Sequence, residues 1–463
     1  MRNSPNSWPL AALLLLSGCS LAPEPAPPPG PIPETWAQAE TSTTPLPAAW
    51  WRTFGSPDID ALVEGALAAN QDLAAALARI EQARAGVRIA GAGLWPRIDA
   101  AGTATDTRQS GSGTLTAITA PGTTRIGSNS GTSYHGQLQV AYEVDLFGRV
   151  RAGRDAARDR LSASAFDHQA LRLITAAEVV QTALELAATE RRLELAAANL
   201  DNARALLALL DARLAAGRSA ALERDQQRGA VAGLEAEIAT LGENRAQQRH
   251  RLAVLSGAPS PDFTPPVPQW AQLRLPEVRP MVPAALLSQR PDLRRAEAEL
   301  AAAGADLGAA RAALYPSLEI SWDRAWTDRS SATLTNLGAS LLAPIFRGGA
   351  LRGEVARSAA QRRELAATYH QAVLTAFGEV SDALAAQRQS ALRGAALDRA
   401  AAAARDAYAS ARAQFDAGAV DYQILLDVQR SQIRAEDAAA NGRLDRFTAV
   451  ISLYRALGGG DLP

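Results

Sequence analysis

The sequence predicts a mainly α-helical chain in which one unit, made of a helix, two strands, a long helix, a turn and a further helix, occurs twice. Composition is the first indication, because alanine dominates the 463 residues while only 5% are aromatic and 21% are charged, and Ala, Leu, Arg, Glu and Gln are strong helix formers. The second is a pair of proline-free spans of 67 residues, Val150 to Ala216 and Leu351 to Ala417. Each is followed by a glycine, Gly217 or Gly418, which is typical of a helix end. Two matching long helices indicate a duplicated architecture.

The N-terminus carries a secretion signal. The apolar run from Leu10 to Leu16 is too short to span a bilayer as a helix. It leads into Leu16-Ser17-Gly18-Cys19, which contains the only cysteine and resembles a bacterial lipobox. The resemblance implies a signal peptide at residues 1–18 and a diacylglycerol and an N-acyl lipid on Cys19, and Ser20 implies sorting to the outer membrane. The alternative is an ordinary signal peptide with an incidental cysteine.

Residues 19–57 are predicted to form a leash between the lipid and the folded body. The stretch from Leu21 to Pro47 is rich in Pro and Ala, which favours an extended, semi-rigid chain. Trp50, Trp51 and Phe54 then offer apolar side chains with which the leash can dock.

The first repeat is expected at residues 58–258. A helical pattern from Asp58 to Gly93 stops at Trp95-Pro96, because proline disfavours helical backbone before it and lacks an N–H donor. Strands are expected at about 96–106 and 137–146, and in the second strand apolar and polar residues alternate, so that one face is apolar and the other polar. The remaining elements are a Gly/Ser/Thr-rich loop from Thr107 to Ser133, the long helix Val150 to Ala216, the turn at Gly217 and a helix from Ala220 to Ser256.

The second repeat, residues 280–460, follows a Pro-rich linker at 259–279 and keeps the same order of elements. Its Arg290-Pro-Asp-Leu293 answers Asn70-Gln-Asp-Leu73 of the first repeat, and Tyr315-Pro316 lies 220 positions after Trp95-Pro96. The expected elements are a helix from Pro283 to Ala313, strands at about 316–326 and 333–344, the long helix Leu351 to Ala417, the turn at Gly418 and a helix from Tyr422 to Leu457.

The element lengths predict a tube of helices that continues into a β-barrel. In the first repeat the two shorter helices have 36 and 37 residues, so that together, end to end, they nearly match the long helix, about 100 Å. Four strands cannot close a barrel, and an open sheet edge in lipid leaves backbone groups unsatisfied. Strands must therefore be shared between subunits. Known barrels start at about eight strands, so at least a dimer is required, and a trimer would give 12.

Composition and motifs argue against several function classes. A net charge of −1 provides no field for binding nucleic acid. The four histidines lie apart from one another and from Cys19, so no metal-ligand spacing exists. The sequence has no phosphate-binding glycine loop and no nucleophile elbow. We therefore expect no enzymatic activity, no metal site and no cofactor apart from the covalent lipid.

Four motifs resemble those of the TolC-type outer-membrane efflux proteins: Tyr142-Glu-Val-Asp-Leu-Phe-Gly-Arg149, Pro344-Ile-Phe-Arg-Gly-Gly349, Leu425-Leu-Asp-Val-Gln-Arg430 and Tyr454-Arg-Ala-Leu-Gly-Gly-Gly460. Together with the lipobox they are most similar to the lipoprotein subgroup that serves resistance-nodulation-division (RND) pumps, and the resemblance covers essentially the whole mature chain. Arg347 departs from the pattern, in which Asp or Asn is expected.

The resemblance implies a homotrimer with a 12-stranded β-barrel in the outer membrane, continuous with a long α-helical barrel that crosses the periplasm. It implies an exit duct for small molecules, such as drugs and toxic compounds, with a periplasmic adaptor protein, an inner-membrane RND transporter and outer-membrane lipid as partners. The transporter would supply the energy. Two alternatives stay open: a lipid-anchored, non-conducting coiled-coil scaffold in the periplasm, and a cation-efflux protein of the same fold, although Met1 and Met281 are the only methionines.

Six residues at the two helical turns form the candidate functional site: Gly217, Gly418, Asp225, Asp427, Arg228 and Arg430. The two glycines would present the turns to the adaptor. The two aspartates would approach the threefold axis as a gate, with Asp427 favoured, since repelling carboxylates favour bound cations. The two arginines would pair with neighbouring carboxylates and hold the closed state. The alternative is that all four charged residues are ordinary exposed charges on helices.

Overall fold

The computed structural model describes residues 32–37, 41, 46–108, 115–119, 122–126, 131–218, 220–328 and 330–460. The signal peptide at 1–18, Cys19 and most of the leash lie outside the described residues. The chain forms two compact units: a sheet unit that contains Glu81–Ser162 and Ala298–Ala367, and a helical unit that contains Pro28–Ile80, Ala163–Glu297 and Thr368–Pro463. Each unit therefore combines segments from both predicted repeats.

The lengths of the elements confirm the duplicated unit. Four pairs of elements have equal lengths: α3 (Gln71–Ala92) and α7 (Pro291–Ala312) with 22 residues, β1 (Arg97–Thr107) and β5 (Ser317–Thr327) with 11, α4 (Arg149–Ala215) and α8 (Ala350–Asp416) with 67, and α5 (Ala221–Leu255) and α9 (Tyr422–Ala456) with 35. The predicted bounds of the last two pairs differ from these by one residue or none. Among the described residues no helix is long and apolar enough to cross a lipid bilayer.

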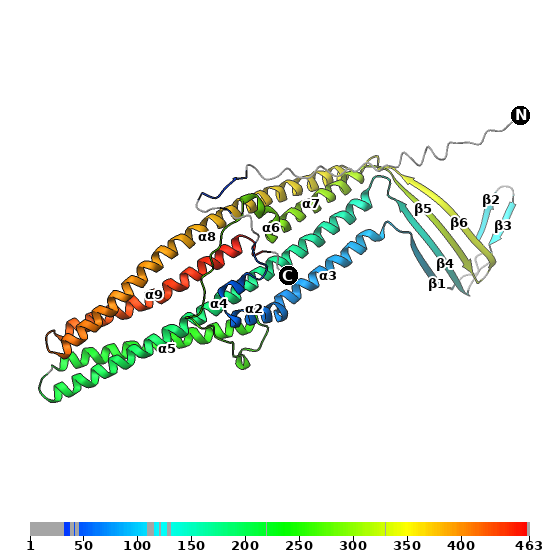
Figure 1. Cartoon of the computed structure of the whole chain (residues 1–463). Helices are drawn as coiled ribbons and strands as arrows, with labels where there is room; N and C mark the ends of the chain where they lie inside the picture. The colour runs from blue at the N-terminus through cyan, green and yellow to red at the C-terminus, as the bar shows by residue number, and fades with distance from the viewer. Residues whose placement is uncertain are drawn as a thin grey trace. The chain divides into compact units, whose positions relative to one another are not determined.

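The sheet unit contains one four-stranded antiparallel sheet in the order β1-β4-β5-β6, where β4 is Gly131–Val144 and β6 is Ser330–Leu342 (Figure 1). The strand pairs β1–β4 and β4–β5 keep one register throughout, whereas the β5–β6 pair shifts register between Trp326 and Thr327. The predicted loop at 107–133 was partly wrong: Leu115–Thr119 (β2) and Gly122–Ile126 (β3) pair as a small hairpin, and β4 already begins at Gly131. Thr and Ile in this stretch favour strands over coil.

The two faces of the four-stranded sheet differ in polarity, as the alternation predicts. One register row across all four strands reads Asp99, Gln139, Asp323 and Asn336, and the Asn336 Nδ2 donates a hydrogen bond to Asp323 Oδ2 at 3.0 Å. The adjacent row on the opposite face reads Ile98, Val140, Trp322 and Leu337. One face of the sheet is therefore polar and the other apolar.

Asp145 joins the sheet to α4. The predicted strand to residue 146 ends at Val144, because the Asp145 carboxylate instead accepts hydrogen bonds from the backbone N–H groups of Val150 at 3.0 Å and Arg151 at 2.9 Å. Burial of Asp145 acts to raise its pKa, but these N–H groups and the Arg151 guanidinium outweigh burial and lower the pKa below its ordinary value. The carboxylate satisfies donors that the first turn of α4 leaves free.

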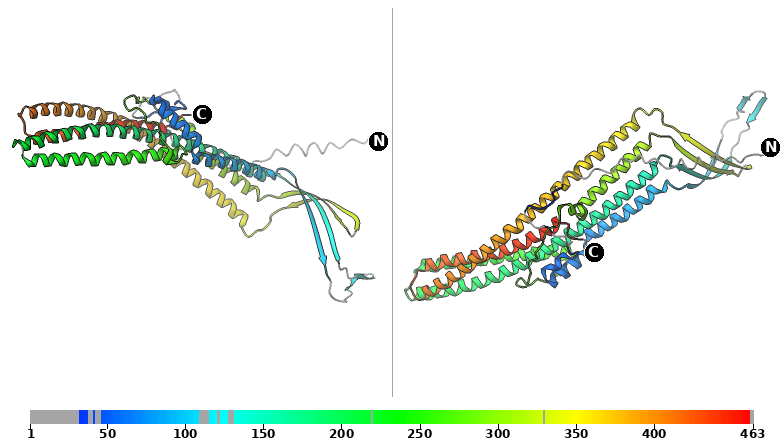
Figure 2. Two further views of the ribbon diagram at one scale, coloured as in Figure 1. Left: turned by 90° about the horizontal axis from the view of Figure 1, so that it is seen from below. Right: turned by 45° about the horizontal axis from the view of Figure 1, so that its top comes forward.

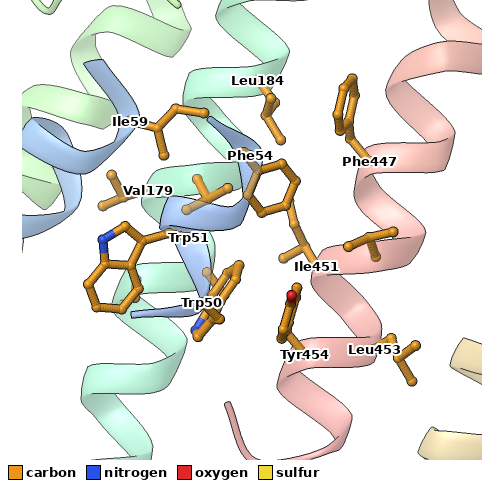
Figure 3. Close-up of a cluster of buried hydrophobic side chains, with 14 of the residues drawn as sticks. Trp50, Trp51, Phe54, Ile59, Val179, Leu184, Phe447, Ile451, Leu453 and Tyr454 are labelled. Atoms are coloured by element: carbon orange, nitrogen blue, oxygen red, sulfur yellow. The ribbon is translucent and has the colours of Figure 1, made fainter. Parts of the chain in front are cut away.

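The end of the leash docks on the helical unit, as predicted. Trp50, Trp51 and Phe54 of the 3₁₀ helix η1 (Trp50–Phe54) are all buried. Figure 3 shows them between α4 and α9, where the Trp50 ring stacks on Tyr454 at 4.8 Å and the Phe54 ring lies 6.0 Å from that of Phe447. This aromatic cluster is the centre of the core of the unit.

The predicted single helix from Asp58 to Gly93 is wrong, because Asn70 divides it into α2 (Pro57–Ala69) and α3. Asn70 has extended backbone, and its Oδ1 accepts hydrogen bonds from the N–H groups of Asp72 at 3.0 Å and Leu73 at 3.1 Å. Its Nδ2 donates to the Leu255 carbonyl at 2.9 Å. One side chain thus caps the start of α3 and satisfies one of the last carbonyls of α5.

The predicted helix from Pro283 to Ala313 is also wrong, and Arg290 divides it at the matching place. The 3₁₀ turn η3 (Pro283–Ala285) and α6 (Leu286–Gln289) precede Arg290, and α7 follows it. The buried Arg290 guanidinium donates to the Ala456 carbonyl at the end of α9 at 3.0 Å. It also pairs with Asp292 and with Glu379 of α8, each at 2.7 Å. Residue 290 thus binds the end of α9 as residue 70 binds the end of α5.

The Arg290–Asp292 pair predicts a pH-dependent stability. Burial acts to raise the pKa of Asp292, but the hydrogen bonds and charge of Arg290 outweigh burial and lower it. A lowered folded-state pKa means that the pair stabilises the fold fully above the unfolded-state pKa of about 3.9 and loses this effect as pH falls through the folded-state value. We expect Asp292→Asn to destabilise the protein most near neutral pH, with the difference from wild type shrinking below about pH 4.

Denaturant unfolding in detergent at a series of pH values measures this difference. The matched control is Asp72→Asn, because Asp72 occupies the same place in α3 and its carboxylate makes no ion pair among the described residues. A destabilisation by Asp292→Asn that stays constant down to pH 2 contradicts the assignment.

Candidate functional site

The two helical turns have the same backbone geometry, and each glycine is required for it. Gly217 and Gly418 have φ angles of 70° and 77°, in the left-handed region that glycine adopts without strain. After α4, the N–H of Gly217 bonds to the Leu214 carbonyl at 2.9 Å and that of Arg218 bonds to the Arg213 carbonyl at 2.8 Å. The turn after α8 repeats both bonds at 3.0 and 2.8 Å. Both turns are therefore Schellman motifs, as the glycine signal predicts.

A small apolar core holds the two turns in one place. It consists of Leu206 and Leu210 of α4, Ala411 and Phe415 of α8, and Tyr422, Leu425 and Leu426 of α9. The Arg213 guanidinium lies over the Phe415 ring at 4.5 Å. The α4–α5 and α8–α9 hairpins lie side by side in each view of Figures 1 and 2. The end of the first hairpin is therefore packed against the end of the second.

A buried hydrogen-bond chain crosses between the hairpins. The Tyr422 hydroxyl, at the first residue of α9, donates to Gln227 Oε1 of α5 at 2.8 Å. Gln227 Nε2 in turn donates to the Ala203 carbonyl of α4 at 2.8 Å. Burial raises the pKa of Tyr422 to about 12, so its hydroxyl keeps its proton and remains a donor throughout the physiological pH range. These two hydrogen bonds connect α9 to both helices of the first hairpin, α4 and α5.

Two matching motifs follow the turns, Asp225-Gln-Gln-Arg228 in α5 and Asp427-Val-Gln-Arg430 in α9. Their charged residues lie near these hydrogen bonds but have different partners. Asp225 is bound by Arg224 of its own helix at 2.8 Å, and Arg228 approaches it only to 3.9 Å. Asp427 is exposed and accepts only long hydrogen bonds of 3.4 Å from Gln423. Asp225 and Asp427 therefore share no hydrogen-bond or ion-pair partner.

Arg430 is exposed and forms no ion pair among the described residues, and its positive charge acts to lower the pKa of the neighbouring Tyr422. Arg430 also lines a cavity of about 250 Å³ between α4, α5 and α9, together with Gln429, Ile433 and Arg434.

The glutamine that the two motifs share is a buried residue of the site that is not among the six candidates from the sequence. Gln227 and Gln429 occupy the third position of their motifs and are 0% and 4% exposed, whereas the aspartate and arginine on either side of each are exposed. A polar residue with a leucine or valine at helical spacing, such as Val231 after Gln227, is the signal that would have placed them inside. The sequence predicts Tyr422 only as the first residue of a helix.

Comparison with known proteins gives the family. Residues 62–258 and 282–459 match the family described as outer membrane efflux protein. The chain belongs to this family. The pyoverdine export outer membrane protein OpmQ of Pseudomonas aeruginosa is 36% identical over 97% of this chain and 96% of its own length. The probable outer membrane lipoprotein SilC of Salmonella typhimurium is 26% identical over 97% and 98%.

Solved structures of outer-membrane channels agree with the family assignment. The outer-membrane channel OprN superposes with a TM-score of 0.86 at 27% identity, over 96% of this chain and all of that one. The fold class, the outer-membrane location and the role of an outer-membrane channel component of an efflux pump are therefore confirmed. The relatives favour this role over the alternative of a non-conducting scaffold. In the part of the chain that the structure describes, no three His, Cys, Asp or Glu side chains gather as a metal site.

The hydrogen bond from the Tyr422 hydroxyl to Gln227 predicts how much removal of this hydroxyl destabilises the protein. Tyr422→Phe removes the hydroxyl and leaves Gln227 Oε1 buried without its donor, so we expect a loss of about 1–2 kcal/mol in unfolding free energy. The control is Tyr408→Phe, since Tyr408 packs partly buried against the same apolar core and its hydroxyl forms no hydrogen bond among the described residues. Denaturant titration of the detergent-solubilised protein measures both, and equal losses contradict the role given to the hydroxyl.

Proposed function

We propose that three copies of this efflux protein form one passive duct, with a 12-stranded barrel in the outer membrane. The supporting observation is the open sheet: among the described residues β1 pairs only with β4, and β6 pairs only with β5. These edge strands of 11 and 13 residues would each expose a row of unpaired N–H and C=O groups, which lipid cannot satisfy. Pairing β6 of one subunit with β1 of the next removes every edge, and three subunits supply 12 strands, a number in the range of known barrels.

The two faces of the sheet set its orientation in that barrel. The row of Asp99, Gln139, Asp323 and Asn336 would line a water-filled lumen, and the row of Ile98, Val140, Trp322 and Leu337 would face lipid. Since a polar lumen of this kind offers no enclosed pocket to select a molecule, the choice of cargo falls to the inner-membrane transporter. The cargo class is small molecules, and OpmQ is named for one such export.

The helices would extend into the periplasm, so the turns at Gly217 and Gly418 form the end that meets a periplasmic adaptor. The adaptor in turn connects the duct to an inner-membrane RND transporter, which supplies the energy, and the protein itself performs no catalysis and needs no cofactor. Covalent lipid on Cys19 would add a second membrane attachment. The likeness to SilC, named as a probable lipoprotein, supports this anchor.

Asp427 is the gate residue that the geometry favours. Asp225 is compensated by Arg224, whereas Asp427 has no cationic partner among the described residues and only a 3.4 Å contact with Gln423. Three such carboxylates about 6 Å apart would repel one another by roughly 3 kcal/mol per pair at an effective dielectric of about 20. The closed mouth would therefore hold a cation between them. Arg430, which forms no ion pair with a described residue, is available to bind a carboxylate of the next subunit.

Planar-bilayer recording tests the duct and its gate together. We expect the purified full chain to run as a heat-modifiable trimer on SDS gels and to form channels that divalent cations block from the side of the helical turns. In Asp427→Ala the block should weaken severalfold, because the carboxylates that hold the cation are gone. Asp225→Ala is the control and should keep the block. A wild-type protein without conductance refutes the duct, and unchanged conductance and block in Asp427→Ala refute the gate.

Site-specific crosslinking tests the adaptor contact. Cysteines at Arg218 and Ala419 place a reactive group beside each turn and leave Gly217 and Gly418, whose positive φ angles a cysteine would strain, unchanged. We expect both to crosslink to the co-expressed adaptor, whereas a cysteine at exposed Leu392, far along α8 from the turn, should not. If neither turn crosslinks while the trimer assembles normally, the turns are not the contact.

A further inference from the structure

The apolar face of the sheet carries one cation, and the other charged residue of this face, Asp106, lies near the end of β1 and pairs with Arg108. Along β5 the residues of this face are Leu318, Ile320, Trp322, Arg324 and Trp326. Among the described side chains of this face on β1, β4, β5 and β6, Arg324 is the one cation. It is exposed, and its cross-strand neighbours are Leu138 on β4 and Thr335 on β6. A guanidinium therefore lies among apolar and neutral groups where lipid is expected.

No carboxylate of the described chain neutralises Arg324. Asp323 precedes it on the strand and so points to the opposite face, where Asn336 binds it. Near the same end of the sheet, Asp328 accepts a hydrogen bond from the Tyr134 N–H at 2.9 Å, and Asp106 pairs with Arg108 at 3.0 Å. Arg324 itself forms no hydrogen bond or ion pair with any described residue, so its guanidinium donors are available to an anion outside the described residues.

Aromatic side chains show where along the strands Arg324 lies. Trp326 is 52% exposed and Tyr134 is 59% exposed. The Trp326 indole covers Gly136 so closely that a Cβ there would lie 2.3 Å from its Cε2 atom, so the ring is held in place on the face. At the opposite ends of the strands, Trp95 and Phe346 are 75% and 87% exposed.

Exposed aromatic residues at both ends of a barrel wall mark the two membrane–water interfaces. An arginine on the lipid face costs about 2–4 kcal/mol at the membrane centre and about 0–1 near an interface. Arg324, between Trp322 and Trp326, is therefore at the interface on the side of the β5–β6 turn. Because the helices extend from the other ends of the strands, this side faces the cell exterior in the proposed duct.

We propose that Arg324 binds a phosphate group of the phosphorylated glycolipid in the outer leaflet of the outer membrane. This inference rests on the proposed function, which sets the side of the membrane. The planar guanidinium offers paired N–H donors that match phosphate oxygens, and the indoles of Trp322 and Trp326 lie on either side along the strand, where they would contact the sugar and the upper acyl chain. Three subunits would supply three such sites around the barrel.

Lipid retention tests this site directly. The purified trimer is incubated with bis-phosphorylated lipid A, dephosphorylated lipid A or phosphatidylglycerol, and bound lipid is counted by native mass spectrometry. We expect Arg324→Gln to retain bis-phosphorylated lipid A about tenfold less than wild type, the loss of one charge-assisted hydrogen-bonded contact, and to match wild type with the dephosphorylated form. Arg324→Lys should retain an intermediate amount, because it keeps the charge without the paired donors.

The matched control is Arg347→Gln, which removes an exposed arginine after the other end of β6 and should leave lipid A retention unchanged. Equal retention of bis-phosphorylated lipid A by wild type and Arg324→Gln overturns the proposal, as does equal preference of wild type for phosphatidylglycerol. Conductance of the same preparations is recorded in parallel. Normal channels without an Arg324 effect refute this site alone, whereas absent wild-type conductance refutes the duct.

Discussion

The architecture depends on how the last backbone carbonyls of two helices, α5 and α9, find hydrogen-bond donors inside the helical unit. A helix that stops within a packed bundle leaves four carbonyls without intrahelical partners, and here α5 and α9 both stop against the start of another helix. Asn70 and Arg290 solve this by donating to the carbonyls of Leu255 and Ala456. Because α3 and α7 begin directly after these two residues, a short helix continues where another ends. Each repeat can thus place two shorter helices along one helix of 67 residues.

The two junctions, where α5 ends at the start of α3 and α9 ends at the start of α7, bind the helix-end carbonyl with different side chains. At the first, the Asn70 amide is neutral and both of its polar atoms are engaged. At the second, the buried Arg290 guanidinium pairs with two partly exposed carboxylates, those of Asp292 and Glu379, and removing both would leave its charge uncompensated. Glycine also lets the chain approach closely at both: Gly257 lies against the Ala69 carbonyl and Gly458 against that of Gln289. The stability of the second junction depends on pH because carboxylates bind Arg290 there, whereas the Asn70 amide at the first junction does not titrate.

The repeated helical and strand patterns of the sequence predicted most of the elements of this fold, whereas single side chains determine where two of the helices break. The long helices were predicted to within one residue because no proline or glycine cluster interrupts them and a Schellman glycine follows each. The similarity of the segments at Asn70 and Arg290 does not predict a helix break at either, since no neighbouring residue requires one. The carbonyls that these two side chains bind lie 185 and 166 positions away. At the turns, glycine geometry was predictable from residue type, but the buried role of Gln227 depends on Tyr422, 195 positions away.

The equal lengths of the two hairpins, whose four arms are the helices α4, α5, α8 and α9, also restrict how such a protein can change during evolution. Side-chain contacts such as Gln227 with Ala203, Arg204 with Glu235 and Gln248 with Thr189 fix α5 against α4 along its length. An insertion of seven residues into each helix of one hairpin alone would move its turn by about 10 Å relative to the other, separating Tyr422 from Gln227. A longer or shorter duct therefore requires compensating insertions or deletions in all four arms at once. Length in this family should thus vary in discrete, paired steps, so that the two halves of the gene are coupled although each encodes a similar unit.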